Sequence, residues 1–210
     1  MVGAKVSAGR VYGGATGEQR IAERRRKLIE AGMNLFGSAG SGSVRVKDVV
    51  VEAGLTERYF YESFSDLDAL FDAVLELADD TVESAVNAAV VEAPDDDISR
   101  MTTVLRTTAD TLAGDPRMIR IIFVEALGKG GRAGARRNEI PLRAAQNFYR
   151  WSGTHAGDFE SSSLETRTKT FAFTGAASEL LISWAEGLLD MTAGQLADFL
   201  VGLYWRINLP

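Results

Sequence analysis

The sequence predicts an all-α protein in which a small N-terminal domain of three helices precedes a larger helical domain. Apolar residues recur at helical spacing along most of the 210 residues, and the alternating pattern of a half-buried strand is nearly absent. The 46% hydrophobic and 25% charged residues are typical of an ordinary globular protein. About nine helices and no strand are expected in total.

Three helices are expected early in the chain, at 18–38, 44–53 and 57–64. Gly54 lies between the second and the third, where a tight turn needs a residue that tolerates a positive φ. Thr56 is expected to cap the third helix by accepting a hydrogen bond from a free N–H of its first turn. These spans make up the predicted N-terminal domain.

The residues at their ends indicate where the remaining helices begin. The pairs that resemble capping boxes are Ser65 with Asp68, Ser162 with Glu165, and Thr192 with Gln195. Asp115 and Pro116 suit the N-cap and the first position of another helix. The expected spans are 67–91, a helix after the acidic run 95–97, 117–127, 138–155, a long helix ending near 189, and a last helix containing 196–204.

Charge is distributed unevenly along the chain. The first 64 residues contain 10 Lys or Arg and 7 Asp or Glu, whereas the remainder contains 13 and 22, which together give the net charge of −6. Residues 1–27 alone contain 7 basic and 2 acidic side chains. A basic head on an acidic body indicates that only the head meets a polyanion. A solvated N-terminal tail would account for the same charge.

Few residues are suited to catalysis. The chain has no cysteine and one histidine, which excludes a thiolate zinc site, a multi-histidine metal centre and a cysteine nucleophile. A hydrolase would have to use His155 with Asp158 or Glu160, and no Gly-x-Ser-x-Gly elbow is present. We therefore expect a protein that is not an enzyme and has no metal and no cofactor.

The opening residues lack the apolar core of a signal peptide, and no window approaches the length of a membrane span. We therefore expect a cytoplasmic protein that does not interact with a membrane.

Two short helices joined through Gly54 match the helix-turn-helix pattern, in which the second helix enters the DNA major groove. Arg58, near the start of that helix, is suited to a guanine edge, and tyrosine hydroxyls suit phosphates. Tyr59 and Tyr61 could instead be core aromatics, although both cannot share one helix face with Phe60. The expected DNA-contacting residues are Arg45, Lys47, Thr56, Glu57, Arg58, Tyr59, Tyr61 and Ser63.

Residues 27–70 resemble the DNA-binding domain of the TetR family of bacterial transcriptional regulators. The resemblance rests on the Ala-Gly-Leu-Thr turn at 53–56, the aromatic residues 59–61 ahead of Phe64, and the Asp66 to Leu70 spacing. It implies a homodimeric repressor that binds a palindromic operator on double-stranded DNA and is released by a small, unidentified effector. An activator or a ligand-independent regulator of the same fold is the alternative.

The resemblance also implies the domain limits and one departure from the family. Residues 1–17 would be a flexible basic arm, 18–66 the helix-turn-helix domain, and 67–210 the ligand-binding and dimerisation domain. The family commonly has a phosphate-contacting lysine where this chain has Leu67. Basic residues of the arm and first helix would supply the missing contact: Arg10, Arg20, Arg24, Arg25, Arg26 and Lys27.

Two sets of residues in the larger domain are assigned by the same resemblance. A small-residue patch and nearby apolar residues would pair two copies, although they could equally be internal core: Gly175, Ser178, Leu181, Ile182, Trp184 and Phe199. A largely apolar pocket would bind the effector: Met118, Ile122, Phe123, Asn147, Phe148, Trp151, His155, Phe171 and Glu179. Each apolar member of the pocket could instead be core, and His155 could be a surface residue.

Overall fold

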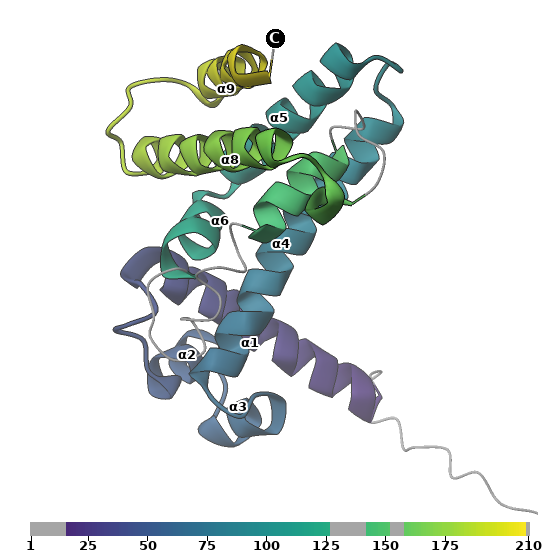
Figure 1. The fold of residues 1–210 in the computed structure, drawn as a ribbon. Helices are drawn as coiled ribbons and strands as arrows, with labels where there is room; N and C mark the ends of the chain where they lie inside the picture. The colour runs from purple at the N-terminus through teal and green to yellow at the C-terminus, as the bar shows by residue number, and fades with distance from the viewer. Residues whose placement is uncertain (1–15, 127–141, 152–157, 209–210) are drawn as a thin grey trace, which may run out of the picture.

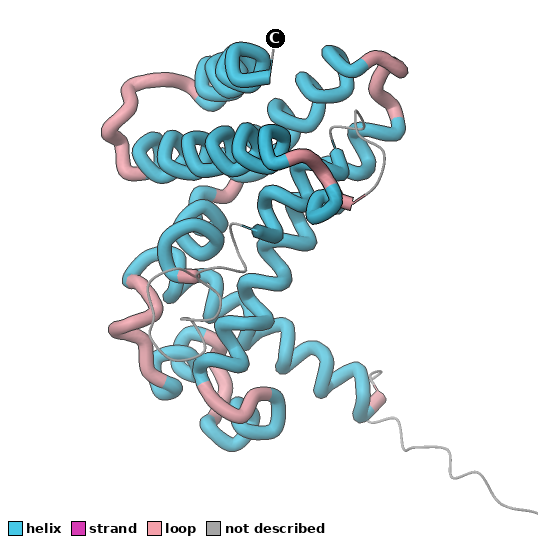
Figure 2. The backbone as a smooth tube through the Cα atoms, in the orientation of Figure 1, coloured by secondary structure: helices cyan, strands magenta, loops and turns pink. Residues whose placement is uncertain are grey.

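The computed structural model describes residues 16–126, 142–151 and 158–208. Within these ranges every regular element is a helix (Figures 1 and 2), as the apolar spacing predicted. Figure 1 shows α1–α3 at one end of the molecule and α8 and α9 at the other, with α4 running between them. The N-terminal helix-turn-helix domain and the larger helical domain are therefore connected along one long helix.

The N-terminal domain consists of α1 (Gly17–Ala39), α2 (Val46–Glu52) and α3 (Glu57–Ser63). Thr16 begins α1 with a capping box, in which its hydroxyl accepts from the N–H of Gln19 and its own N–H donates to the Gln19 side chain. The three helices pack around a core of fully buried residues that includes Leu28, Phe36, Val49 and Phe60. Burial of these apolar side chains holds the short α2 and α3, since isolated helices of seven residues are unstable.

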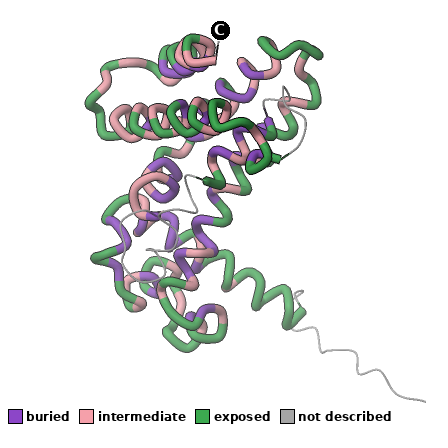
Figure 3. Tube along the Cα trace, in the orientation of Figure 1, coloured by how far each residue is buried: buried purple, intermediate pink, exposed green. Residues whose placement is uncertain are grey.

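Helix α4 (Leu67–Val91) belongs to the cores of both domains. Leu70 and Val74 are fully buried in its first half, and Val86 is fully buried in its second half. Figure 3 shows buried positions recurring along α4, where it passes α1 and then α5. A displacement of α4 would therefore disturb packing in both domains.

The larger domain is built from shorter and longer helices around the second half of α4. Its elements are α5 (Asp97–Gly114), α6 (Pro116–Ile119), the π-helix η1 (Arg120–Glu125), the helix at 142–151, the 3₁₀ turn η2 (Phe159–Ser161), α8 (Leu164–Ala185) and α9 (Ala193–Asn208). Helix α5 packs against both α4 and α9, and α8 packs against α9. This arrangement encloses the cavity described below.

Two predicted capping boxes were displaced by one residue. Asp66 rather than Ser65 caps α4, accepting from the N–H of Ala69 at 2.7 Å, while the Ser65 hydroxyl donates to the Asp66 carboxylate. Ser163 rather than Ser162 caps α8, because the Ser162 hydroxyl donates back to the carbonyl of Phe159. Competing local hydrogen bonds therefore removed the two predicted caps.

Two other predicted caps have different outcomes. The Thr56 side chain makes no capping hydrogen bond, although Thr56 does precede α3, so that prediction is wrong. The box of Thr192 and Gln195 is confirmed by both of its hydrogen bonds, at 2.8 and 3.2 Å.

The helix predicted at 117–127 is instead the short α6 followed by the π-helix η1. Asp115 and Pro116 start it as expected, with the Asp115 carboxylate accepting from the N–H of Arg117. The π-register brings residues five apart close together, so Arg120 donates to Glu125 at 3.2 Å. Apolar spacing alone carries no signal for that change of register.

The long helix expected to end near 189 ends at Ala185. Gly187 has a φ of 75°, and the N–H of Leu188 donates to the carbonyl of Ser183. This is the hydrogen-bond pattern of a Schellman motif, which stops a helix at a left-handed glycine.

Candidate nucleic-acid interface and effector cavity

The exposed side of α2 and α3 carries most of the residues expected to contact DNA. Phe60 has 0% exposure and fixes the rotation of α3, so Arg58 points outward with 83% of its side chain exposed. Arg45, Lys47, Thr56, Glu57 and Tyr61 are also exposed. These exposed residues lie on two neighbouring helices and the turn between them.

The turn between α2 and α3 sets the angle of this surface. Gly54 adopts a φ of 62°, and the N–H of Leu55 donates to the carbonyl of Val50 at 2.8 Å. That hydrogen bond closes the end of α2 directly ahead of α3. A second short helix can therefore cross the first at once, as the helix-turn-helix geometry requires.

Tyr59 and Ser63 are the two predicted residues that face α1 rather than open solvent. The Arg24 guanidinium lies 4.5 Å from the Tyr59 ring centroid, and Tyr59 is half-buried. The carbonyl of Ser63 accepts from Arg25 at 2.9 Å. Both residues therefore fasten α3 to α1, a role that spacing within α3 did not indicate.

Two of the arginines on this surface form ion pairs with carboxylates of the same domain. Arg45 lies 3.3 Å from Asp48, and its hydrogen bonds hold the pKa of that carboxyl below its ordinary value. Arg58 donates to Glu62 at 3.0 Å. The side chain of Lys47 is exposed at the start of α2. Of the arm and first-helix residues, Arg20 and Arg24–Lys27 lie on α1, while Arg10 lies outside the described residues.

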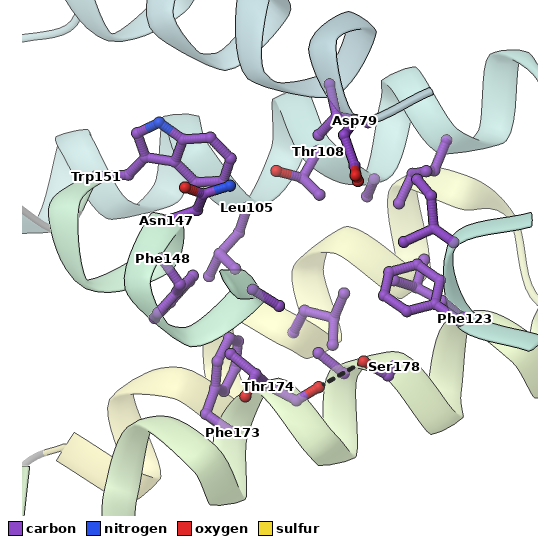
Figure 4. Close-up of a pocket in the computed structure, with 18 residues that line it drawn as sticks. Asp79, Leu105, Thr108, Phe123, Asn147, Phe148, Trp151, Phe173, Thr174 and Ser178 are labelled. Carbon is purple, nitrogen blue, oxygen red and sulfur yellow. Dashed lines mark hydrogen bonds between the residues drawn. The ribbon is translucent and has the colours of Figure 1, made fainter. Parts of the chain in front are cut away.

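A cavity lies in the larger domain between α4, α5, η1, the helix at 142–151, α8 and α9 (Figure 4). About 820 Å³ of empty space lies between these elements, a volume that includes the part open to solvent. Five residues of the predicted pocket line it: Ile122, Phe123, Asn147, Phe148 and Trp151.

Three other residues of the predicted pocket do not line this cavity. Met118 is buried in α6, which packs on α1. Phe171 is exposed on α8 and contacts Phe159 at 5.6 Å between ring centroids, and Glu179 is also exposed. Helical geometry explains the last two, because the α8 side that faces the cavity carries Phe173, Thr174 and Ala177 instead. His155 lies outside the described residues.

Several residues that line the cavity were not assigned to the effector pocket from the sequence pattern. They lie on α4, α5, the helix at 142–151, α8 and α9: Asp79, Val82, Leu105, Thr108, Ala109, Leu112, Ala144, Phe173, Thr174, Ala177, Ser178, Leu181 and Leu200. On α5 the i, i+3, i+4, i+7 spacing of Leu105, Thr108, Ala109 and Leu112 defines one face. That spacing indicates an inward face, and the fold decides whether such a face meets a cavity or other side chains.

The polar groups around the cavity are largely engaged within the protein. Ser178 donates to the carbonyl of Thr174 at 2.8 Å (Figure 4), and the indole N–H of Trp151 donates to Asn87 at 3.0 Å. Asp79 pairs with Arg143 at the edge of the cavity. The lining is therefore mainly aromatic and aliphatic, which favours an apolar ligand.

The residues predicted for the dimer interface do not share one surface. Leu181 is 4% exposed and lines the cavity, so its assignment to the dimer interface is wrong. Ser178 also lines the cavity, and Trp184 donates to the carbonyl of Met191 at 2.8 Å. Ile182 and Trp184 are half-buried, whereas Gly175 and Phe199 are exposed. Of the two small residues predicted on α8, Ser178 therefore lines the cavity, whereas Gly175 is exposed.

Within the parts of the chain that the structure describes, no group of three or more His, Cys, Asp or Glu side chains could hold a metal ion. No helix there has the length and apolarity needed to cross a membrane.

Comparison with known proteins adds two kinds of likeness. Residues 28–74 match the family model of the bacterial regulatory proteins of the tetR family. A search of curated proteins finds no match. These 47 residues contain the second half of α1, α2, the turn at Gly54, α3 and the first eight residues of α4.

Solved structures resemble the whole fold at low sequence identity. A TetR-family regulator from Syntrophomonas wolfei is 16% identical, with a TM-score of 0.72 and coverage of 90% of this chain and 96% of that one. The fatty acid degradation regulator FadR from Bacillus halodurans is 14% identical, with a TM-score of 0.69 and coverage of 89% and 95%. FadR from Bacillus subtilis, solved with stearoyl-CoA, is 16% identical, with a TM-score of 0.67 and coverage of 85% and 96%.

Proposed function

Since residues 28–74 match the model of the bacterial regulatory proteins of the tetR family, we propose that the chain is a ligand-responsive repressor of that family that binds a palindromic DNA operator as a homodimer. The observation that carries this proposal is the outward Arg58 on α3, held there by the fully buried Phe60 behind it. In a helix-turn-helix, that position meets base edges in the major groove.

Each predicted DNA residue has a distinct task in this proposal. Arg58 reads a guanine through two parallel N–H donors, and Lys47 and Arg45 contact phosphates at the start of α2. The exposed Tyr61 adds a hydroxyl for phosphate. Only base contacts carry sequence information, so Arg58 and Lys47 should differ in how their loss affects binding.

We propose that α8 and α9 pair two copies of the chain. Phe199 on α9 and Leu188 after α8 are exposed large apolar residues. Figure 1 shows α8 and α9 at the end of the molecule opposite to α3. A pair held there would present two α3 helices to one duplex, as half-sites about 34–36 Å apart require. The acidic larger domain would set the distance between the two α3 helices and would not contact DNA.

The effector in this proposal is a small molecule with an apolar chain. The mainly apolar lining of the cavity supports it, and FadR from Bacillus subtilis, which shares the fold, was solved with stearoyl-CoA. To release DNA, such a ligand must bind the DNA-incompetent arrangement more tightly than the competent one. An activator or a ligand-independent regulator would use the same head on DNA and differ only in this response.

Selection of binding sites from random DNA tests the DNA-binding part. A palindromic sequence is expected, and affinity for it should fall steeply with salt as counterions are released. Arg58→Ala should relax the preference at one base pair in each half-site, and Lys47→Ala should weaken binding to all sequences alike. Recovery of no preferred sequence would contradict the proposal.

A second experiment tests the effector. Stearoyl-CoA and free stearate are titrated into the protein bound to its selected DNA, and the fraction bound is measured. Release by either compound is expected, and Phe123→Ala should raise the concentration required, whereas Ile98→Ala, on the surface of α5, should not. Unchanged DNA affinity with a bound acyl compound would favour the ligand-independent alternative. A transcription assay then separates a repressor from an activator.

A further inference from the structure

The carboxylate of Glu62 on α3 lies between two guanidinium groups. Its Oε1 accepts from Arg58 Nε at 3.0 Å, and its Oε2 lies 3.8 Å from Nη2 of Arg24. Arg58 belongs to α3, whereas Arg24 belongs to α1. Glu62 therefore connects an exposed arginine of the DNA-facing helix to a different helix of the same domain.

Arg24 is itself held in place. Its guanidinium lies over the ring of Tyr59 at 4.5 Å, and only 23% of its side chain is exposed. The next residue, Arg25, lies over the Phe64 ring at 4.3 Å and donates to the carbonyl of Ser63. These contacts hold the Arg24 guanidinium in place on α1. Glu62 is therefore restrained by a second helix, which an ion pair within α3 alone would not provide.

The atom that Glu62 holds is the one least needed for reading a base. A guanidinium has donors on Nε and on two terminal nitrogens, and a fork onto the O6 and N7 of guanine needs two of them. With Nε bound to Glu62, the two terminal nitrogens of Arg58 are left as donors for a base. The side chain also loses rotamer freedom before DNA arrives, which lowers the entropic cost of the contact.

We propose that Glu62 is a specificity-determining positioning residue of the DNA-binding head. It aims Arg58 at a guanine and, as a negative charge beside the duplex, it weakens attraction to phosphates in general. This inference rests on the proposed DNA-binding function. It has an unusual consequence, because loss of Glu62 should raise binding to unrelated DNA while lowering the preference for the operator.

The test compares the unmodified chain with Glu62→Ala and Glu62→Gln. Affinities are measured for the selected operator, for an operator in which the Arg58-dependent guanine is replaced, and for random DNA. Glu62→Ala should lower the guanine preference by at least about threefold, a part of what a forked arginine contact supplies. Glu62→Gln keeps an oxygen that accepts from Arg58 Nε and should retain an intermediate preference. Both variants should bind random DNA more tightly than the unmodified chain.

Glu23→Ala is the matched control. Glu23 is also an exposed carboxylate of the N-terminal domain, and it pairs with an arginine, Arg26, at 2.8 Å, away from Arg58. Its removal should raise general affinity without a change in guanine preference. In the Arg58→Ala background, Glu62→Ala should have no further effect on base preference. Thermal unfolding by circular dichroism checks that each variant is folded.

The outcomes separate the two proposals. If the unmodified chain shows no sequence preference, the proposed function fails and this inference fails with it. If the unmodified chain prefers its operator but Glu62→Ala keeps the full guanine preference, only the role of Glu62 is overturned. The same holds if Glu62→Ala lowers the preference equally in the presence and absence of Arg58.

Discussion

At the scale of single residues, the DNA-facing surface depends on one glycine and one phenylalanine. Gly54 takes a left-handed φ of 62° in the turn, and Phe60 is fully buried behind α3. The first sets the path of the chain between the two short helices, and the second sets the rotation of the helix that carries Arg58. Neither residue is expected to contact DNA, yet both position the side chains that are proposed to contact it.

Gly54→Ala should destabilise the chain by about 1–2 kcal/mol, because a Cβ is disfavoured at that φ. Urea unfolding followed by circular dichroism measures the loss. Gly42→Ala is the control, since Gly42 has open space around it and lies outside the left-handed region. Equal stability of the two variants would show that the turn has no need of glycine.

Phe60→Ala should cost about 3–5 kcal/mol, since it removes a whole aromatic side chain from a packed core. The same unfolding measurement applies. Val51→Ala, on α2 with 72% exposure, should change stability by less than about 0.5 kcal/mol. A small effect of Phe60→Ala would mean that α3 does not rely on this anchor.

At the scale of helices, α1 and α6 approach each other more closely than most side chains allow. A Cβ on Gly37 would lie 2.6 Å from the Cβ and 3.1 Å from the Cα of Arg117. The same Arg117 donates to Asp115, Glu30 and Asn34, which joins α6 to α1 by hydrogen bonds as well as by contact. The glycine thus permits the docking of a helix from the larger domain on the N-terminal domain.

Gly37→Ala should therefore destabilise the chain by about 1–3 kcal/mol through overpacking against the backbone of α6. Gly17→Ala, at the other end of the same helix with nothing nearby, should leave stability unchanged or slightly raised. Denaturant midpoints of the two variants give the comparison. A stable Gly37→Ala protein would indicate that α6 shifts at little cost.

The helices could be predicted from the sequence more fully than their ends. Repeated apolar positions identified α1 to α4 with nearly correct limits, because burial dominates helix formation in a packed domain. The capping residues of α4 and α8 were each missed by one position, because Ser65 donates to Asp66 and Ser162 donates to the carbonyl of Phe159. The π-helix η1 was missed because its five-residue contact between Arg120 and Glu125 leaves no apolar signature.

The site could be predicted only in part. The outward position of Arg58 followed from the helical rotation that Phe60 imposes, a local property of seven residues. The cavity depends on how six helices meet, so only five of its residues were named, and Phe171 and Glu179 were placed on the wrong side of α8. The contact of Tyr59 with Arg24 joins residues on separate helices and could not be read from either helix alone.

At the scale of the whole molecule, the two domains are joined by polar contacts in addition to α4. The Arg117 side chain donates to Glu30 and Asn34 on α1. It also donates twice to Asp115 within the larger domain, at 2.8 and 2.6 Å, and this holds the pKa of Asp115 below its ordinary value. Ser41, which is 2% exposed, donates from both its N–H and its hydroxyl to Glu125. Charged groups at this junction make its strength dependent on pH.

A carboxyl whose pKa is lowered by folding stabilises the native state above its unfolded pKa and loses that contribution as pH falls through its folded pKa. We therefore expect the unmodified chain to exceed Asp115→Asn in stability at neutral pH, with the difference shrinking below pH ~4. Urea unfolding across this pH range measures it. Asp110→Asn, an exposed position on α5, should give no such trend. A constant difference between the unmodified chain and Asp115→Asn would exclude this linkage.

The π-helix η1 has two neighbours at once. Phe123 forms part of the wall of the cavity. Glu125, two positions later in the same turn, accepts two hydrogen bonds from Ser41, which follows the end of α1. A shift of this turn would change both the wall of the cavity and the hydrogen bonds between Ser41 and Glu125. One turn of the chain therefore contacts both the cavity of the larger domain and the N-terminal domain.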